Sequence, residues 1–101
     1  MYIEDKLNAI PLPKQYVRNG KNCYLDPYRK RLIEVQPEET VRQRVAKYCE
    51  TKLSAPAEMI RLEIPMSKHV KGAAGRADII IYASDDTPLI IVECKNTDIA
   101  F

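Results

Sequence analysis

Three charged residues near the C-terminal end are of the types that phosphodiester hydrolysis uses. Asp78 precedes three isoleucines, Glu93 follows a second apolar run, and Lys95 stands two positions further on. Mg²⁺ is commonly held by one or two carboxylates together with waters and phosphate oxygens. A lysine beside such a site can orient or deprotonate an attacking water and stabilise charge on the phosphate. A solvated strand end, in which Lys95 neutralises Glu93, has the same residues and is the competing interpretation.

A β-hairpin would bring these residues together. The β-branched runs 79–82 and 89–92 flank the turn-forming residues 84–88, which is typical of a hairpin. If Ala83 faces Pro88 across a four-residue loop, Asp78 falls opposite Glu93. Residues two apart on a strand share a face, so the hairpin predicts Asp78, Glu93 and Lys95 on one side. Adjacent carboxylates repel each other, and a divalent cation would relieve that repulsion.

Three sequence blocks carry a resemblance to a known family. P-E-E-T-V-R-Q at 37–43, G-R-A-D-I-I-I-Y at 75–82 and P-L-I-I-V-E-C-K at 88–95 are similar, in that order, to the N-terminal nuclease domain of the type I restriction enzyme R (motor) subunit. That domain is a member of the PD-(D/E)XK nuclease superfamily, and here Ala77 stands where the superfamily name has proline. The resemblance covers roughly residues 24–98, because D-P-Y-R-K-R at 26–31 also fits the lead-in to the first block.

The resemblance implies a metal-dependent DNA endonuclease. Mg²⁺, for which Mn²⁺ can substitute, would bind Asp78 and Glu93, with Lys95 next to a water that attacks the phosphodiester with inversion. The implied partners are DNA and the other restriction-modification subunits or a fused helicase domain, and the implied location is the cytoplasm of a prokaryote. The competing hypothesis is a non-catalytic module of the nuclease fold that binds DNA or a partner protein.

The clearest helix is predicted from Pro37 to about Leu53. Proline suits the first helical position, and Glu38 and Glu39 complement the positive end of the helix dipole. Superfamily relatives place a glutamate of this helix beside the metal. Apolar residues recur at three- and four-residue intervals and predict the face that packs on the sheet: Val41, Val45, Tyr48, Cys49 and Leu53. Stepping back along this stripe favours Glu38 as the catalytic glutamate, and Glu39 remains a possible metal-binding or water-orienting residue.

The remaining elements predict an α+β fold with an α/β-like, restriction-endonuclease-like core. One helix would pack on a mixed three-stranded sheet in a core spanning 37–101, with 59–65 as one strand. Residues 1–36 would form a small β-rich arm, because Asn19-Gly20 is a strong hairpin signal. The chain ends six residues after Lys95, where the family continues into a helix and a strand. We therefore expect a core that is truncated at the C-terminus. If the missing elements are needed for catalysis, this chain alone would be inactive. The chain would be either part of a longer protein or covered by a second copy in a homodimer.

Composition limits the other possibilities. The chain of 101 residues has a formal net charge of +2, so DNA affinity must come from local basic clusters. The candidates are listed here: Arg29, Lys30 and Arg31 in one turn, and Lys68, Lys71 and Arg76 in a loop that leads to Asp78. Three cysteines without C-x-x-C spacing and a single histidine make a zinc site an unlikely assignment and point to a reducing compartment. No apolar run approaches the roughly 20 residues of a membrane-spanning helix.

Overall fold

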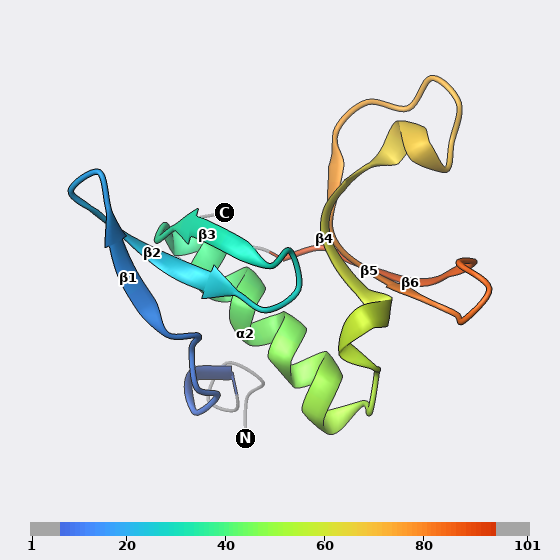
Figure 1. Ribbon diagram of the computed structural model, residues 1–101. Helices are drawn as coiled ribbons and strands as arrows, with labels where there is room; N and C mark the ends of the chain where they lie inside the picture. Colours follow the sequence, from blue (N-terminus) through green and yellow to red (C-terminus); the bar gives the residue numbers. More distant parts are fainter. Residues whose placement is uncertain (1–6, 95–101) are drawn as a thin grey trace, which may run out of the picture.

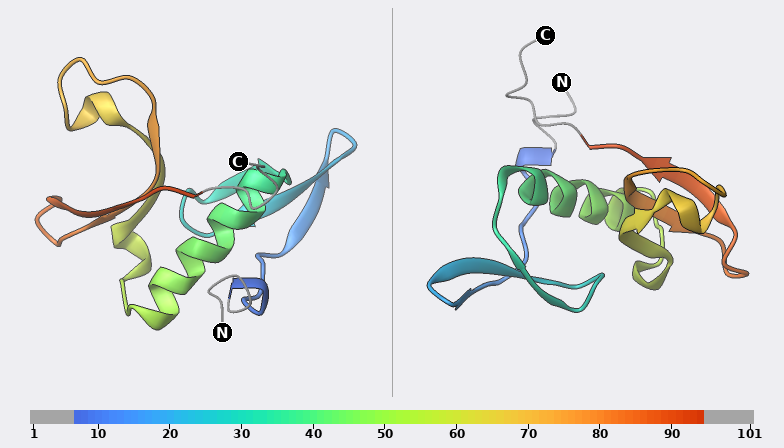
Figure 2. Two further views of the ribbon diagram at one scale, coloured as in Figure 1. Left: turned by 180° about the vertical axis from the view of Figure 1, so that it is seen from behind. Right: turned by 90° about the horizontal axis from the view of Figure 1, so that it is seen from above.

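The computed structural model describes residues 7–94, in which one long helix lies between two three-stranded sheets (Figures 1 and 2). The first sheet has the order β1-β2-β3 and the second β4-β5-β6. The strands are β1 (Gln15–Arg18), β2 (Lys21–Asp26), β3 (Arg31–Glu34), β4 (Ile60–Pro65), β5 (Arg76–Tyr82) and β6 (Pro88–Val92). Helix α2 spans Pro37–Lys52, and two short 3₁₀ helices cover Ala57–Met59 and Met66–Lys68. The chain is thus a small α+β domain. No helix within residues 7–94 is long and apolar enough to cross a membrane.

The N-terminal hairpin forms at the predicted dipeptide. Arg18 pairs with Lys21 across a two-residue loop, and both Asn19 (φ 54°) and Gly20 (φ 75°) adopt left-handed conformations. Two such residues make the type I′ turn that matches strand twist. Strand β3 then pairs antiparallel with β2 and completes the predicted arm. The division of the chain at residue 36 stays a prediction.

Helix α2 matches its predicted span to within one residue, but its buried face differs from the prediction. The buried positions are Glu39, Gln43, Ala46 and Cys49, which follow one another at helical spacing. Leu53, predicted to be in the stripe, is 56% exposed. The helix buries a mixed polar and apolar face because it contacts charged groups at one end and the β4–β6 sheet at the other.

The apolar core joins helix α2 to the second sheet. Ala46 and Cys49 of the helix pack with Ile60, Leu62, Ile79 and Ile81 of β4 and β5. The opposite face of this sheet holds Ala77, Ile80 and Tyr82 under Met59, Ile64 and Met66. Strand β5 is therefore buried on both faces, which fixes the residues that follow Arg76.

The predicted register of the β5–β6 hairpin is confirmed next to the candidate site. Ile79 pairs with Val92 and Ile80 with Ile91, which is the predicted alignment. Near the turn the pairing shifts by one residue, so Pro88 faces Tyr82 and not Ala83. The prediction of a mixed sheet is wrong for the residues described, because every strand pair among them is antiparallel.

Candidate functional site

Asp78 lies between two further carboxylates in the strand register. Leu62 pairs with Ile79 and Ile64 with Ala77, so Glu63 of β4 stands opposite Asp78. On the other side, the Ile79–Val92 pair, continued by one residue, sets Glu93 opposite Asp78. Glu63 has a left-handed backbone (φ 52°), unusual for a residue other than glycine within a strand. Three acidic residues from three adjacent chain segments thus lie side by side across this sheet.

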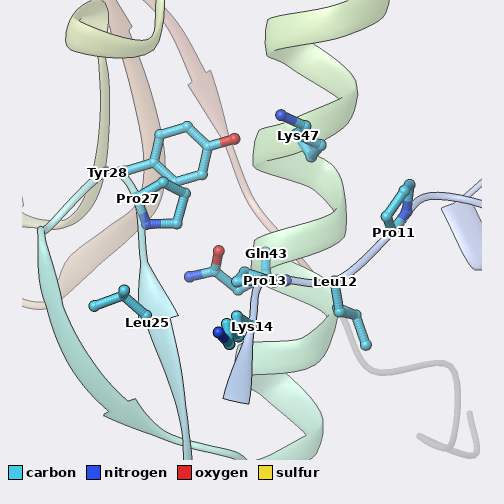
Figure 3. A pocket seen from close by; sticks show the side chains of 9 residues that line it. All are labelled: Pro11, Leu12, Pro13, Lys14, Leu25, Pro27, Tyr28, Gln43 and Lys47. Carbon is cyan, nitrogen blue, oxygen red and sulfur yellow. The ribbon is translucent and has the colours of Figure 1, made fainter. Parts of the chain in front are cut away.

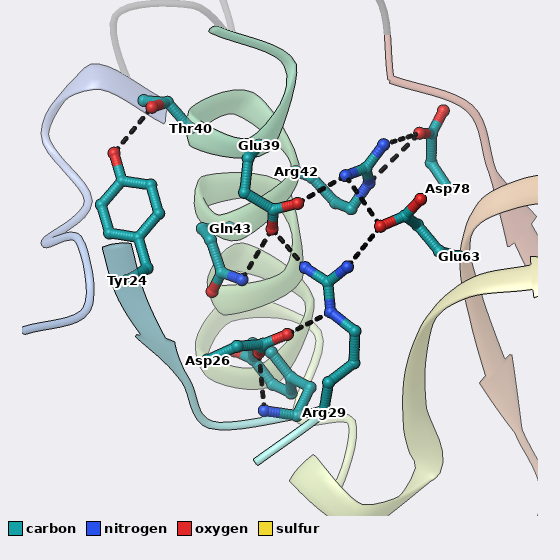
Figure 4. Close-up of polar contacts among 10 residues, drawn as sticks. Tyr24, Asp26, Arg29, Glu39, Thr40, Arg42, Gln43, Glu63 and Asp78 are labelled. Atoms are coloured by element: carbon teal, nitrogen blue, oxygen red, sulfur yellow. Dashed lines mark hydrogen bonds and ion pairs between the residues drawn. The ribbon is translucent and has the colours of Figure 1, made fainter. Parts of the chain in front are cut away.

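Arg42 of helix α2 binds Asp78 directly (Figure 4). Its Nη2 and Nε atoms donate to Oδ1 of Asp78 at 2.8 and 3.2 Å. The other carboxylate oxygen, Oδ2, accepts from the Cys94 backbone N–H at 2.9 Å. These bonds turn the Asp78 side chain toward the helix.

Glu39, not Glu38, is the helix glutamate at this site. The expectation that Glu38 faces the sheet is wrong: Glu38 is exposed, whereas Glu39 is 3% exposed. Glu39 Oε1 accepts from Arg42 Nη1 at 2.6 Å, and its Oε2 accepts from Gln43 Nε2 at 2.9 Å. The helix therefore turns Glu39, whose carboxylate accepts hydrogen bonds from two side chains of the same helix, toward the network.

Arg29 links the N-terminal arm to the site. Its guanidinium binds three carboxylates from three elements, those of Asp26, Glu39 and Glu63 (Figure 4). Its side chain is 9% exposed, so it offers no free guanidinium to a DNA backbone, and the expected DNA contact at Arg29 is wrong. Lys30 and Arg31, its neighbours in the predicted basic patch, are exposed.

The charges in this network do not balance. Asp26, Glu39, Glu63 and Asp78 carry four formal negative charges, and Arg29 and Arg42 carry two positive ones, which leaves two negative charges in excess. Burial raises the pKa of Asp78, but the Cys94 amide, Arg42 and the Glu93 carboxyl outweigh it and hold the pKa below its ordinary value. The carboxylate is therefore anionic at neutral pH, and a divalent cation would offset the network's excess negative charge.

The lowered pKa of Asp78 gives a testable pH dependence. Its contribution to stability is fully present above the unfolded pKa, near 3.8, and is lost as the pH falls through the lower folded pKa. We expect the free energy of unfolding to fall with acid in this window, and the Asp78→Asn variant to lose that part of the slope. Urea denaturation between about pH 5 and 2.5 measures it, with Glu58→Gln at an exposed position as control. Equal slopes in parent and Asp78→Asn would contradict the assignment.

Of the predicted site residues Glu93 and Lys95, only Glu93 lies within the described part of the chain. Glu93 is exposed, directly after β6, and influences the pKa of Asp78. Lys95 lies outside the described residues, so its position beside Asp78 and Glu93 stays a prediction. Cys94 stands between Glu93 and Lys95 in the sequence. Burial and the neighbouring Asp78 anion raise the pKa of its thiol to about 12, which keeps the thiol protonated and unreactive at neutral pH.

The second predicted basic cluster lies on the connection from β4 to β5 and on the first residue of β5. Lys68, Lys71 and Arg76 are exposed, and their role in DNA binding stays a prediction. His69 is occupied by a structural contact, because its Nε2 lies 2.7 Å from the hydroxyl of Tyr82. No catalytic role is assigned to this histidine.

A pocket of about 360 Å³ lies between the N-terminal segment and helix α2 (Figure 3). It is lined mainly by prolines, leucines and Tyr28, with Lys14, Lys47 and Gln43 as the polar groups. Gln43 also binds Glu39, so the pocket backs onto the charged network. It contains neither Asp78 nor Glu93, so the candidate site lies outside it.

Comparison with protein families bears directly on this network. Residues 37–101 match the family model described as "Type I restriction enzyme R protein N terminus". The chain belongs to this family. Comparisons with curated proteins and with solved structures found no match. In this R protein N-terminal domain the matched segment includes helix α2, the second sheet and all the candidate carboxylates except Asp26.

The R protein N-terminal domain offers Mg²⁺ a limited set of ligands. Within residues 7–94, no group of three or more acidic, cysteine or histidine side chains is arranged to hold a metal ion together. Asp78 and Glu93 nevertheless fit a Mg²⁺ site of the kind that uses one or two carboxylates and completes its shell with waters and phosphate oxygens. The excess negative charge of the network favours the same ion.

Sequence reasoning missed Glu63, Asp26 and the role of Arg42. Glu63 lies between Leu62 and Ile64, so in the sequence it resembles an ordinary charged residue on the solvent face of an alternating strand. The signal that would reveal it is the β4–β5 register, which aligns it with Asp78. Arg42 was detectable as the fourth residue after Glu38 and the third after Glu39, at the spacing of a helical ion pair.

Proposed function

We propose that this R protein N-terminal domain is a Mg²⁺-dependent endonuclease that hydrolyses phosphodiester bonds in DNA. The observation that carries the proposal is the hairpin register of β5 and β6, which aligns Asp78 with Glu93 inside the segment matched by the family. Two carboxylates on neighbouring chain segments are a donor set suited to Mg²⁺ and a phosphate. The excess negative charge around them supports the same ligand.

The chain's own residues would share the work as follows. Asp78 and Glu93 hold the metal, which when bound supplies a Lewis acid for a phosphate oxygen and lowers the pKa of water. Asp78 is kept anionic by the Cys94 amide and by Arg42. Lys95 orients or deprotonates the attacking water. Glu39 binds Arg42 in the metal-free domain, which is the part the helix glutamate plays in this proposal.

The family gives the wider context of this activity. The proposed partners are DNA and the other parts of a restriction-modification system, in which the motor moves the DNA that this domain cuts. We place its action in the prokaryotic cytoplasm on the same ground. Leu89 and Ile91 on one face of β6 and Ile90 on the other are 48–64% exposed, and a further chain segment or a second copy would cover them.

Metal binding is the first test. Isothermal titration of Mn²⁺ into the chain at low salt and near neutral pH should show binding that weakens at least about tenfold, or about 1.4 kcal/mol, in Asp78→Asn. Asp85→Asn, a turn residue of the same hairpin, is the matched control and should bind as the parent does. Equal binding in the parent and Asp78→Asn would remove Asp78 from the metal site.

A second candidate function is a non-catalytic module that binds DNA or a partner through this fold. The observation that favours it is the saturation of Asp78 Oδ1 by Arg42, because an arginine can neutralise an acidic site without a metal. DNA affinity that depends steeply on salt and is indifferent to Mn²⁺ and to Asp78→Asn would support this function. Metal-dependent affinity would support the endonuclease.

A further inference from the structure

The guanidinium of Arg42 lies against the Asp78 carboxylate, where a metal cation bound to Asp78 would also have to lie. Two of its nitrogen atoms bind the same oxygen, Oδ1 of Asp78, so that oxygen has no lone pair free for a metal. The third, Nη1, lies 2.6 Å from Glu39 and 3.6 Å from Glu63. One guanidinium therefore neutralises carboxylates from α2, β4 and β5.

Because Arg29 also binds Glu39 and Glu63, these two carboxylates do not depend on the contact between Arg42 and Asp78. Arg29 binds Glu39 through Oε2, the oxygen that Arg42 does not use, and it also binds Glu63. If Arg42 leaves Asp78, both glutamates keep a guanidinium. Asp78 is also more exposed than Asp26, at 19% against 0% for the side chain, so a cation can reach it from solvent.

We propose that Arg42 is an exchangeable counter-ion, which pairs with Asp78 in the metal-free domain and binds a DNA phosphate once a divalent cation takes its place. The proposal rests on the proposed function, because it requires a metal at Asp78. Displacement breaks two hydrogen bonds to Oδ1 and leaves Nε and Nη2 as a fork. That fork matches two phosphate oxygens in the way it matches a carboxylate.

The exchange couples metal binding to DNA binding. While Arg42 holds Asp78, its charge repels an approaching cation and its donors are not available to phosphate. Each ligand releases the group that the other needs, so each should raise the affinity for the other by the same factor. Binding of either ligand therefore opens the site to the other.

Removing Arg42 separates these effects. Mn²⁺ should bind Arg42→Ala about tenfold more tightly than the parent, because a competing positive charge is gone. The gain in affinity for a short DNA duplex that Ca²⁺ gives the parent should be lost in the same variant. Arg44→Ala is the control, since Arg44 lies on the same helix and its described polar contact is to Asn8. Arg42→Lys keeps the charge without the fork and serves if the alanine variant does not fold.

The parent chain offers a measurement that needs no variant. The Arg42 Nε–H signal in nitrogen-15 spectra should exchange slowly with water in the metal-free domain and lose that protection as Mg²⁺ is added. A protected signal that Mg²⁺ binding leaves unchanged would overturn the exchange, as would equal Mn²⁺ affinities in parent and Arg42→Ala, or an Arg42→Lys variant that keeps the full Ca²⁺-induced gain in DNA affinity. Absence of metal binding in all of these chains would instead overturn the metal site itself, and the exchange with it.

Discussion

Replacing Arg29 with alanine should lower the free energy of unfolding by about 3–5 kcal/mol, the usual cost of removing one partner from a buried ion pair. Asp26 is fully buried and Glu39 nearly so, and the variant would remove the guanidinium that pairs with Asp26 and one of the two that pair with Glu39. Glu63 would lose its closest cation as well. Arg29 also joins the turn after β2 to α2 and β4, so its loss should loosen the arm from the second sheet.

Urea denaturation at neutral pH measures this effect. Arg31→Ala is the matched control, because Arg31 belongs to the same basic run but is exposed, and it should change stability by less than about 0.5 kcal/mol. Arg29→Lys should fall between the two, since one ammonium cannot reach three carboxylates as a fork does. Similar stabilities for Arg29→Ala and Arg31→Ala would mean that the carboxylates are solvated, and that the network holds little of the fold together.

The elements that sequence reasoning predicted well are governed by local interactions. Asn19-Gly20 fixes one hairpin because few other dipeptides adopt two left-handed conformations. The β5–β6 register follows from turn length and β-branched runs, and it stayed correct from Ile79 to Ile81 although the pairing shifts at Tyr82. Register near the site is anchored by packing of Ile79 and Ile81 into the core, so an error at the turn does not reach Asp78.

The phase of helix α2 could not be read in the same way. An apolar stripe predicts the buried face only when burial of apolar surface decides the packing. Here the first turns of the helix bury Glu39 and Gln43, which bond to each other, and Glu39 also binds Arg29 of the N-terminal arm. A prediction based on Val41 and Val45 therefore selected Glu38, about 100° away from the residue that faces the network.

The basic run at residues 29–31 shows the same limit. By composition its three cations look equivalent, yet Arg29 is buried in ion pairs while Lys30 and Arg31 are exposed. Lys30 has a left-handed backbone (φ 56°), which turns the chain immediately after Arg29. Arg29 turns inward because it binds the carboxylates at positions 39 and 63. No local sequence pattern links those positions to position 29.

On the endonuclease function proposed above, alanine at Asp78 should reduce Mg²⁺-dependent DNA cleavage by at least about a thousandfold in an R protein that carries this domain, a loss of about 4 kcal/mol in transition-state stabilisation. The physical reason is that Asp78 lies at the centre of the site, opposite both Glu63 and Glu93, and is the carboxylate kept anionic by an amide and a guanidinium. Without it, the excess charge that favours a divalent cation falls from two to one. Lys95→Ala should cause a comparable loss if Lys95 acts on the water.

A cleavage assay with a supercoiled plasmid and Mg²⁺ tests this, with translocation or ATP hydrolysis by the same protein as the internal control. Asp85→Ala, in the exposed turn of the same hairpin, should leave cleavage unchanged. Because Asp78 also contributes to stability, the thermal unfolding of each variant must be measured alongside, and Asp78→Asn provides an isosteric second variant. Cleavage that persists in a folded Asp78→Asn protein would move the catalytic centre elsewhere and leave this network as a structural ion-pair cluster. Cleavage lost while translocation persists would instead join the Asp78 network to phosphodiester hydrolysis.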